Sequence, residues 1–181
     1  MKLKEITYCG LMVAIIASLG CVPLINLPFF PVPISFQSAG IMLAGSLLGR
    51  KLGFWSVVVF LLLVAIGLPL LAGFRGGIGV FAGPTAGYLL SWPVCAYVIG
   101  LLVTWFRRIP NFSRFLLANL LGGMVLMNCV GASYLVWQSG LSWNQVAISS
   151  LAFIPGDGLK AVLVALIVTQ LQRHHRLPQL R

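Results

Sequence analysis

Acidic residues are almost absent from this chain. Only two of its 181 residues are aspartate or glutamate, against twelve lysines and arginines. Enzymes that work through metal ions usually need several carboxylates, and a catalytic nucleophile needs a base beside it. The shortage of acids therefore argues against both kinds of active site, and it makes each of the two carboxylates worth separate study.

Polar segments long enough to form a soluble domain are also missing. Hydrophobic residues make up 60% of the chain, charged residues 8%, and the mean hydropathy is +1.03. A helical span needs about 20 apolar residues, so six spans with short connections use nearly the whole length. We expect an all-α integral membrane protein whose residues 1–181 form a single transmembrane domain. The six spans are expected near residues 6–22, 36–49, 54–71, 83–106, 115–137 and 155–171.

Cysteines and histidines show no pattern typical of a metal site. Cys9, Cys21, Cys95 and Cys129 have no paired spacing and stand in apolar surroundings. We expect them to be buried small hydrophobic residues, with no disulfide framework and no zinc site. The two histidines stand together in the basic C-terminal tail, far from any carboxylate. No metal and no cofactor is therefore expected.

The basic residues predict the orientation in the membrane. Cytoplasmic loops carry an excess of lysine and arginine, and alternate connections of this chain hold ten of its twelve basic residues: Lys2, Lys4, Arg50, Lys51, Arg107, Arg108, Arg114, Arg173, Arg176 and Arg181. The intervening connections hold only Arg75. We therefore expect six spans with both termini in the cytoplasm, and the net charge of +10 needs no nucleic acid to explain it.

The expected outer connections are apolar and nearly uncharged. They comprise residues 23–35, 72–82 and 138–154. Irregular backbone at membrane depth is tolerated where it is buried in protein or lines a cavity. We therefore expect these loops to cover an outward-facing ligand pocket. In the third loop, Ser142 and Gln145 have the spacing of a capping box, which predicts a short surface helix.

The middle outer loop runs into the stretch "RGGIGVFAGPTAGYLL", residues 75–90. Its glycines allow left-handed backbone or a close approach to a ligand, and its proline stands near the first turn of the expected fourth span. A glycine-rich turn before a helix can present backbone N–H groups to an anion. A tight re-entrant turn needed for close packing of helices explains the same residues.

A second unusual stretch, "FIPGDGLKAV", opens the expected sixth span. Asp157 is one of the two acids, and Lys160 is the only basic residue inside an expected span. Ionisable groups within spans are costly and usually face a cavity or each other. The other interpretation is that Asp157 favours the helix N-terminus and Lys160 neutralises it. With Gln37, Tyr88 and Arg75, the pair predicts a pocket for a small molecule with an amide-like head and an acidic tail.

Three stretches together resemble the BioY family, the biotin-specific substrate-capture (S) components of energy-coupling factor (ECF) transporters. "GGIGVFAGPTAGY" fits the family pattern G-x-G-x(3)-G-P-T-x-G-Y at Gly77, Gly79, Gly83, Pro84, Thr85, Gly87 and Tyr88. "PVPISFQSAGIMLAGSLLGRKLG" from Pro31 and "FIPGDGLKA" from Phe153 also agree. The chain departs from the family where Ser35, Ala152 and Gly158 replace threonine, proline and leucine. Gly158 costs about 1 kcal/mol relative to alanine within a helix and could loosen the turn that carries Asp157 and Lys160.

The resemblance implies a six-helix bundle that binds biotin at its outer side and works with a transmembrane coupling subunit and a pair of cytoplasmic ATPases. It implies a substrate site made of Asp157, Lys160, Tyr88, Gln37, Phe36, Arg75, Gly77, Gly79 and Thr85. The ureido group would meet Asp157 with Gln37, and the ring would meet Tyr88 and Phe36. Either Lys160 or Arg75 would meet the carboxylate.

Small residues recur every four positions in the first expected span, at Gly10, Ala14 and Ser18. Such a stripe lets helices approach closely in lipid. The resemblance makes it the expected docking face for the coupling subunit, and packing inside the bundle is the other interpretation.

Two alternatives to biotin capture are an S component for another water-soluble vitamin and a membrane-embedded enzyme that uses Asp157 as a base.

Overall fold

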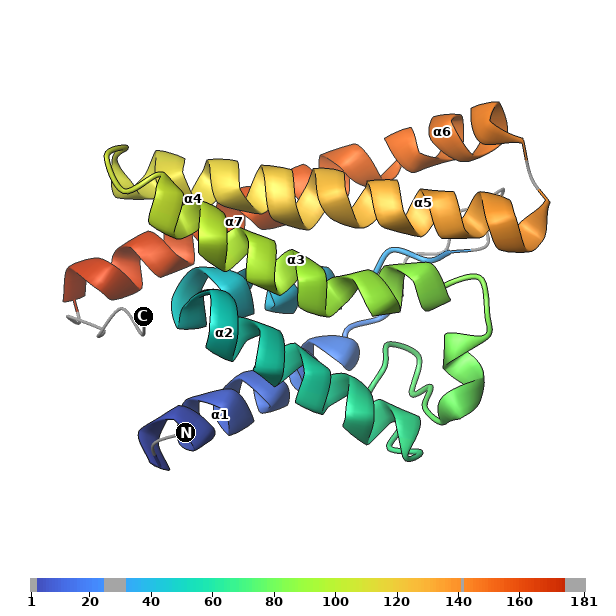
Figure 1. Cartoon of the computed structure of the whole chain (residues 1–181), viewed down its shortest axis with the longest axis horizontal. Coiled ribbons are helices and arrows are strands. Elements are labelled where there is room, and N and C mark those ends of the chain that lie inside the picture. Colours follow the sequence, from blue (N-terminus) through green and yellow to red (C-terminus); the bar gives the residue numbers. More distant parts are fainter. Residues whose placement is uncertain (1–2, 25–31, 141, 175–181) are drawn as a thin grey trace.

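Long apolar runs interrupted by glycine and proline determine the helices of this chain. A computed structural model describes residues 3–24, 32–140 and 142–174. Its helices are α1 (Leu3–Gly20), α2 (Gln37–Ala65), the 3-10 helix η1 (Ile78–Phe81), α3 (Ala86–Trp105), α4 (Asn111–Asn119), the π-helix η2 (Leu120–Val125), α5 (Leu126–Ser139), α6 (Trp143–Leu151) and α7 (Phe153–His174). The expected all-α membrane bundle is confirmed (Figure 1).

Several helices suit a bilayer by length and composition. Among the described residues, four helical stretches are long and apolar enough to cross a membrane: Gln37–Ala65, Ala86–Trp105, Asn111–Ser139 and Phe153–Arg173. Large apolar side chains point outward from them, as Leu62 (59% exposed) and Leu163 (45%) do. Exposed apolar surface of this extent suits lipid and not water, so the chain is a multi-pass membrane protein.

A sharp break divides α2 into two helical segments, residues 37–48 and 50–65. Gly49 has φ 75° and ψ −175°, a conformation that is essentially restricted to glycine. Beyond it the chain folds back, because a Cβ built on Gly53 would lie 2.8 Å from the Ala44 carbonyl oxygen. The boundary expected between residues 49 and 54 lies at this break.

Helix ends differ from the expected ones where apolar sequence continues into a loop. The third span was expected to reach residue 71, but α2 ends at Ala65. Gly67 then takes φ 110° and Pro69 cannot donate a helical hydrogen bond, although the side chains around them remain apolar. Hydropathy alone does not distinguish such a loop from the helix before it.

Glycines bring α2 and α3 into close contact. A Cβ on Gly45 would lie 2.6 Å from the Ala96 carbonyl oxygen, and one on Gly100 would lie 2.2 Å from the Arg50 backbone nitrogen. Neither position accepts a side chain without movement of the backbone. Because α2 and α3 each carry residues of the cavity described below, this contact fixes one of its walls.

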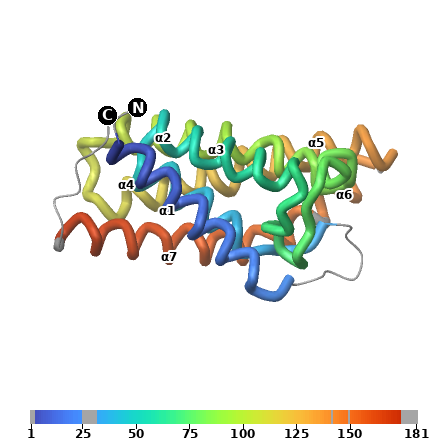
Figure 2. The backbone as a smooth tube through the Cα atoms, turned by 90° about the horizontal axis from the view of Figure 1, so that it is seen from below, coloured from blue at the N-terminus to red at the C-terminus, as the bar shows by residue number. Residues whose placement is uncertain are grey.

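The two ends of the bundle differ in charge. The start of α1, the break in α2, the turn between α3 and α4 and the end of α7 lie at one end, and η1 and α6 lie at the other (Figures 1 and 2). The first end carries the described basic residues Lys4, Arg50, Lys51, Arg107, Arg108, Arg114 and Arg173. The expected basic residues Lys2, Arg176 and Arg181 lie outside the described residues.

The short helix expected in the third outer loop is confirmed as α6. The Ser142 backbone N–H donates to Oε1 of Gln145 at 3.1 Å, and the Gln145 N–H donates to Oγ of Ser142 at 3.4 Å. These two bonds form the predicted capping box. Of the first expected lid loop, residues 25–31 lie outside the described residues.

The cysteines only partly follow the expectation. Cys9 and Cys95 are buried, whereas Cys21 and Cys129 are exposed. A thiol is apolar enough to face lipid, so the apolar surroundings in sequence do not distinguish a core position from a lipid-facing one.

Candidate functional site

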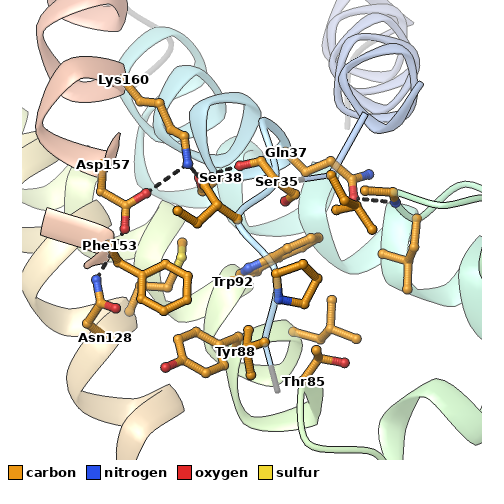
Figure 3. Close-up of a pocket in the computed structure, with 18 of the residues that line it drawn as sticks. Ser35, Gln37, Ser38, Thr85, Tyr88, Trp92, Asn128, Phe153, Asp157 and Lys160 are labelled. Atoms are coloured by element: carbon orange, nitrogen blue, oxygen red, sulfur yellow. Dashed lines mark hydrogen bonds and ion pairs between the residues drawn. The ribbon is translucent and has the colours of Figure 1, made fainter. Parts of the chain in front are cut away.

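A cavity opens between the start of α2, the loop after α2, and helices α3, α5 and α7 (Figure 3). Counting its open mouth, it occupies about 620 Å³, within the range of small-molecule sites. Its apolar lining consists of Leu24, Val32, Pro33, Ile34, Leu71, Ala72, Leu89, Trp92, Met127 and Phe153. Its polar lining consists of Ser35, Gln37, Ser38, Arg75, Thr85, Tyr88, Asn128, Asp157 and Lys160.

A buried ion pair lies on the wall that α7 provides. α7 begins at Phe153, so Asp157 and Lys160 occupy its first two turns and share one face at i,i+3 spacing. Lys160 Nζ lies 2.9 Å from Asp157 Oδ1, and the two side chains are only 5% and 6% exposed. Lys160 Nζ also donates to Ser38 Oγ at 3.0 Å. The pair therefore links α7 to the start of α2 and has no net charge.

Asn128 on α5 holds the other oxygen of the carboxylate. Its Nδ2 donates to Asp157 Oδ2 at 3.2 Å and to the Met124 carbonyl oxygen at 2.9 Å. Sequence reasoning missed this residue. An amide inside an otherwise apolar span was the available signal, because polar groups in spans usually face the bundle interior.

Aromatic rings form the side of the cavity next to the ion pair. The ring of Tyr88 on α3 stacks on that of Phe153, with centroids 6.2 Å apart and planes at 29°. Trp92, one turn further along α3, lines the same cavity. Gly131 on α5 leaves room for Tyr88, because a Cβ there would lie 2.3 Å from the Tyr88 ring. The arrangement provides a flat apolar surface beside fixed polar groups.

Gln37 connects the start of α2 to the loop that follows it. Its amide nitrogen, Nε2, donates to the carbonyl oxygens of Leu70 at 3.0 Å and Ile16 at 3.3 Å. Its Oε1 accepts the Ala72 N–H at 2.9 Å. Both amide hydrogens are therefore engaged by backbone, so Gln37 shapes the cavity wall and has only acceptor capacity left for a ligand.

Arg75 brings a positive charge to the cavity from the loop between α2 and α3. The loop narrows at a bridge between Leu71 and Arg75, and Phe74 between them takes φ 55°. The Arg75 Nε donates to the Ala72 carbonyl oxygen at 3.3 Å. Arg75 is exposed, whereas Lys160 is buried against a carboxylate, so the two cations of the site differ in environment.

Six of the nine residues expected at a substrate site line the cavity: Asp157, Lys160, Tyr88, Gln37, Arg75 and Thr85. Phe36, Gly77 and Gly79 do not belong to the lining. The Phe36 ring instead lies 5.9 Å from Lys160 Nζ. The Gly77 N–H donates to the Val64 carbonyl oxygen at 2.8 Å, so this glycine ties the loop to the end of α2.

The small-residue stripe of α1 lies on the outside of the bundle. Gly10, Ala14 and Ser18 are all exposed, and a Cβ on Gly10 would meet no atom within 4 Å. The opposite face of α1 carries the buried side chains of Met12, Val13 and Ile16. The stripe is therefore not used for packing inside the described bundle.

Comparison with known proteins places the chain among transporters. It is 43% identical over 175 residues to "Biotin transporter BioY" of Rhizobium etli, a match that covers 92% of each chain. It is 42% identical over 174 residues to "Biotin transporter BioY" of Lactococcus lactis subsp. cremoris, over 95% of this chain and 92% of the relative. A crystal structure described as the S-component for biotin from an ECF-type ABC transporter superposes with a TM-score of 0.91 at 42% identity, covering 95% of this chain and 92% of that one.

A family model agrees with these relatives over nearly the full length. The model of the BioY family matches residues 1–177. This range includes the ion pair of α7, the glycine-rich loop and the exposed stripe of α1. The chain belongs to the BioY family.

Proposed function

We propose that the chain captures biotin in this cavity at the outer side of the cytoplasmic membrane and delivers it inward as the S component of an ATP-driven ECF transporter. The observation that carries the proposal is the buried Asp157–Lys160 pair on the wall of a mostly apolar cavity. Relatives at 43% and 42% identity are named as biotin transporters, which gives the ligand its identity.

The chemistry of biotin suits the polarity of the cavity. Its ureido head is neutral and presents two N–H donors and one carbonyl acceptor. Asp157 has acceptor capacity beyond its two present bonds, and the Lys160 ammonium has a third hydrogen to donate. The apolar thiophane ring would lie against Tyr88, Trp92 and Phe153. A net-neutral pair is matched to an uncharged head better than a lone charge would be, because burying an unpaired charge is costly.

We assign the valerate carboxylate of biotin to Arg75 and not to Lys160. Arg75 is exposed and contributes to the lining, and a guanidinium binds a carboxylate through two parallel hydrogen bonds. Lys160 already pairs with Asp157 at 2.9 Å. Phe36, Gly77 and Gly79 would then act through the geometry of the site and not through contact with biotin.

We propose six spans with both termini in the cytoplasm of a prokaryotic cell. The break at Gly49 supports this count, because it divides α2 into two helical segments, residues 37–48 and 50–65. The gathering of described basic residues at one end of the bundle supports the orientation. Fluorescent protein fused to either terminus should fluoresce, since it folds in the cytoplasm, while a periplasmic reporter at the same positions should stay inactive.

The stripe Gly10, Ala14 and Ser18 is proposed to dock the transmembrane coupling subunit, which in turn binds the ATPase pair. Exposed small residues allow close helix contact in lipid. Ala14→Trp should abolish co-purification with the coupling subunit while biotin binding persists. Ala147→Trp, on exposed α6, is the matched control and should leave the complex intact.

The proposal assigns transport and no catalysis to Asp157. The relatives are named as transporters, and an enzyme would return a changed product. Biotin recovered after prolonged incubation with the protein should have an unaltered mass. An S component for a different vitamin would instead bind that vitamin and leave biotin free in solution.

Calorimetric titration of the detergent-solubilised protein with biotin tests the function directly. Asp157→Asn should weaken binding at least tenfold, about 1.4 kcal/mol. Glu5→Gln changes the only other acid of the chain, at the opposite end of the bundle, and should leave the affinity as it was. Absence of biotin binding by folded parent protein would refute the function, whereas unaltered binding by Asp157→Asn would refute only the site.

A further inference from the structure

Arg114 is a buried arginine at the basic end of the bundle, far from the cavity. It lies near the start of α4 and is only 5% exposed. Arginine is almost never buried in this way unless its charge is paired. No carboxylate of the described chain forms an ion pair with Arg114, and the Asp157 carboxylate is held by Lys160 at the other end. The charge of Arg114 therefore lacks the partner that its burial requires.

The contacts of the guanidinium are made with neutral groups. Nη2 of Arg114 donates to Oε1 of Gln172 on α7 at 3.3 Å, and the Phe115 ring centroid lies 4.7 Å from Cζ. Nε is buried without a hydrogen bond among the described residues. Nη1 makes no hydrogen bond there either, but it is not sealed from the surface as Nε is. The group therefore keeps its charge and a donor that an external acceptor can reach.

The surroundings of Arg114 add to its positive potential. Arg107, which is exposed in the turn between α3 and α4, lies close enough for its charge to act on Arg114. The start of a helix carries a partial positive charge, and Pro110 before α4 provides no side-chain cap. These positive groups repel one another in the absence of an anion. An anion bound among them would relieve that repulsion.

Neighbouring side chains indicate that this site lies at the surface of the bilayer. Trp105 at the end of α3 is 77% exposed, and exposed tryptophans are enriched at the level of the lipid headgroups. Leu117 on α4 and Leu171 on α7 are also exposed and suit contact with acyl chains. α4 and the end of α7 lie together at this end of the bundle (Figures 1 and 2). The anion at such a place is best supplied by a lipid.

We propose that Arg114, with Arg107 and the start of α4, binds the phosphate of an anionic phospholipid headgroup between α4 and the end of α7. A guanidinium binds phosphate through parallel hydrogen bonds, and basic pockets between membrane helices bind lipid headgroups in this way. The bound lipid neutralises the buried charge and so stabilises the contact between the two helices. This site is separate from the biotin cavity and does not depend on the proposed function.

Thermal unfolding of the purified full-length protein in nonionic detergent tests the proposal. Phosphatidylglycerol should raise the unfolding temperature of the parent by roughly 4 °C more than phosphatidylcholine at the same mole fraction, because a ligand of the folded state stabilises it. Inorganic phosphate should have no such effect, because it lacks acyl chains. Native mass spectrometry should show phosphatidylglycerol retained by the parent in preference to phosphatidylcholine.

Arg114→Gln removes the charge and keeps an amide that can still donate to Gln172. It should lose the preference for phosphatidylglycerol in both measurements while its affinity for biotin stays unchanged. Arg50→Gln is the matched control, because it makes the same change at an exposed arginine of the same end and should keep the full preference. Should Arg114→Gln fail to fold, Arg107→Gln takes its place and should weaken the preference.

Three results would overturn the proposal. Equal stabilisation of the parent by the two lipids would exclude an anionic headgroup site, and equal stabilisation by inorganic phosphate would assign the site to a soluble anion. An unaltered preference in folded Arg114→Gln, or in Arg107→Gln if that variant replaces it, would exclude these residues as the binding groups. Failure of the parent to bind biotin would refute only the proposed function, because the lipid measurements contain no biotin.

Discussion

The start of α7 and the loop between α2 and α3 line the same cavity by different means. α7 contributes two buried side chains, Asp157 and Lys160, held by a regular helix. The loop contributes mainly backbone shape, with positive φ at Gly67, Gly73, Phe74 and Gly77. Its single charge, Arg75, is exposed. α7 therefore supplies charged groups in fixed positions, and the loop supplies a wall whose shape depends on its backbone conformation.

This difference follows from where each region can place a charge. A buried charge needs a partner that is fixed in position, and consecutive turns of a helix provide one at i,i+3. An exposed charge on a loop is solvated by water and does not need another side chain as its partner. We therefore expect substitutions of Asp157 and Lys160 in α7 to act first on binding and substitutions of loop glycines with positive φ to act first on stability.

Lys160→Ala should produce the largest effect. It leaves the Asp157 carboxylate buried without its ammonium, and breaking a buried pair from one side costs several kcal/mol. We expect biotin to bind at least a hundredfold more weakly, about 2.7 kcal/mol, as measured by calorimetry. Lys51→Ala removes an exposed lysine at the other end and should have no effect on affinity. Parent-like binding by Lys160→Ala would mean that the buried ion pair of α7 does not contribute to the binding of biotin.

Gly77→Ala should destabilise the protein by about 2 kcal/mol. Gly77 has φ 88° and ψ 164°, a region that alanine avoids. Gly79→Ala is the matched control, because Gly79 has no positive φ and a Cβ there meets nothing within 4 Å. Thermal unfolding in detergent should separate the two variants. Equal unfolding temperatures would contradict the view that the loop depends on backbone conformation.

Arg75→Ala should weaken binding of biotin about tenfold, or 1.4 kcal/mol. The loss should be absent for biotin amide, because a neutral tail has no carboxylate for the guanidinium to meet. Arg107→Ala, an exposed arginine at the opposite end, controls for net charge. If the amide loses as much affinity as biotin, Arg75 acts on the loop and not on the ligand.

Gly158→Ala should have the smallest effect, and a favourable one. Gly158 lies inside α7, and a Cβ there meets nothing within 4 Å. Alanine should stabilise the helix by up to about 1 kcal/mol with unchanged affinity. Gly131→Ala gives the contrast, since its Cβ would lie 2.3 Å from the Tyr88 ring. A drop in affinity on Gly158→Ala would show that this turn of α7 needs its flexibility.

The all-α bundle and the ion pair could be predicted because each has a local signal. Apolar composition indicates membrane helices, and Asp157 and Lys160 are conspicuous in a chain with so few charges. The capping box of α6 is likewise contained in four consecutive residues, Ser142 to Gln145. Signals of this kind need no knowledge of which helices become neighbours.

Asn128 and Gln37 could not be assigned in the same way. The Asn128 amide meets a carboxylate 29 residues away, and Gln37 meets the backbone of Ala72, 35 residues away. A helix surrounded by lipid on one side and protein on the other is apolar all round, so periodicity does not show which face looks inward. Partners across helices therefore depend on the packing, which the sequence pattern leaves open.

The neutrality of the Asp157–Lys160 pair has an electrical consequence. Moving one elementary charge through a membrane potential of 100 mV takes about 2.3 kcal/mol. The two opposite charges lie 2.9 Å apart on one helix, so they move together and their contributions cancel. Any displacement of α7 along the field therefore requires no net electrical work on these two residues, whatever voltage the cell maintains.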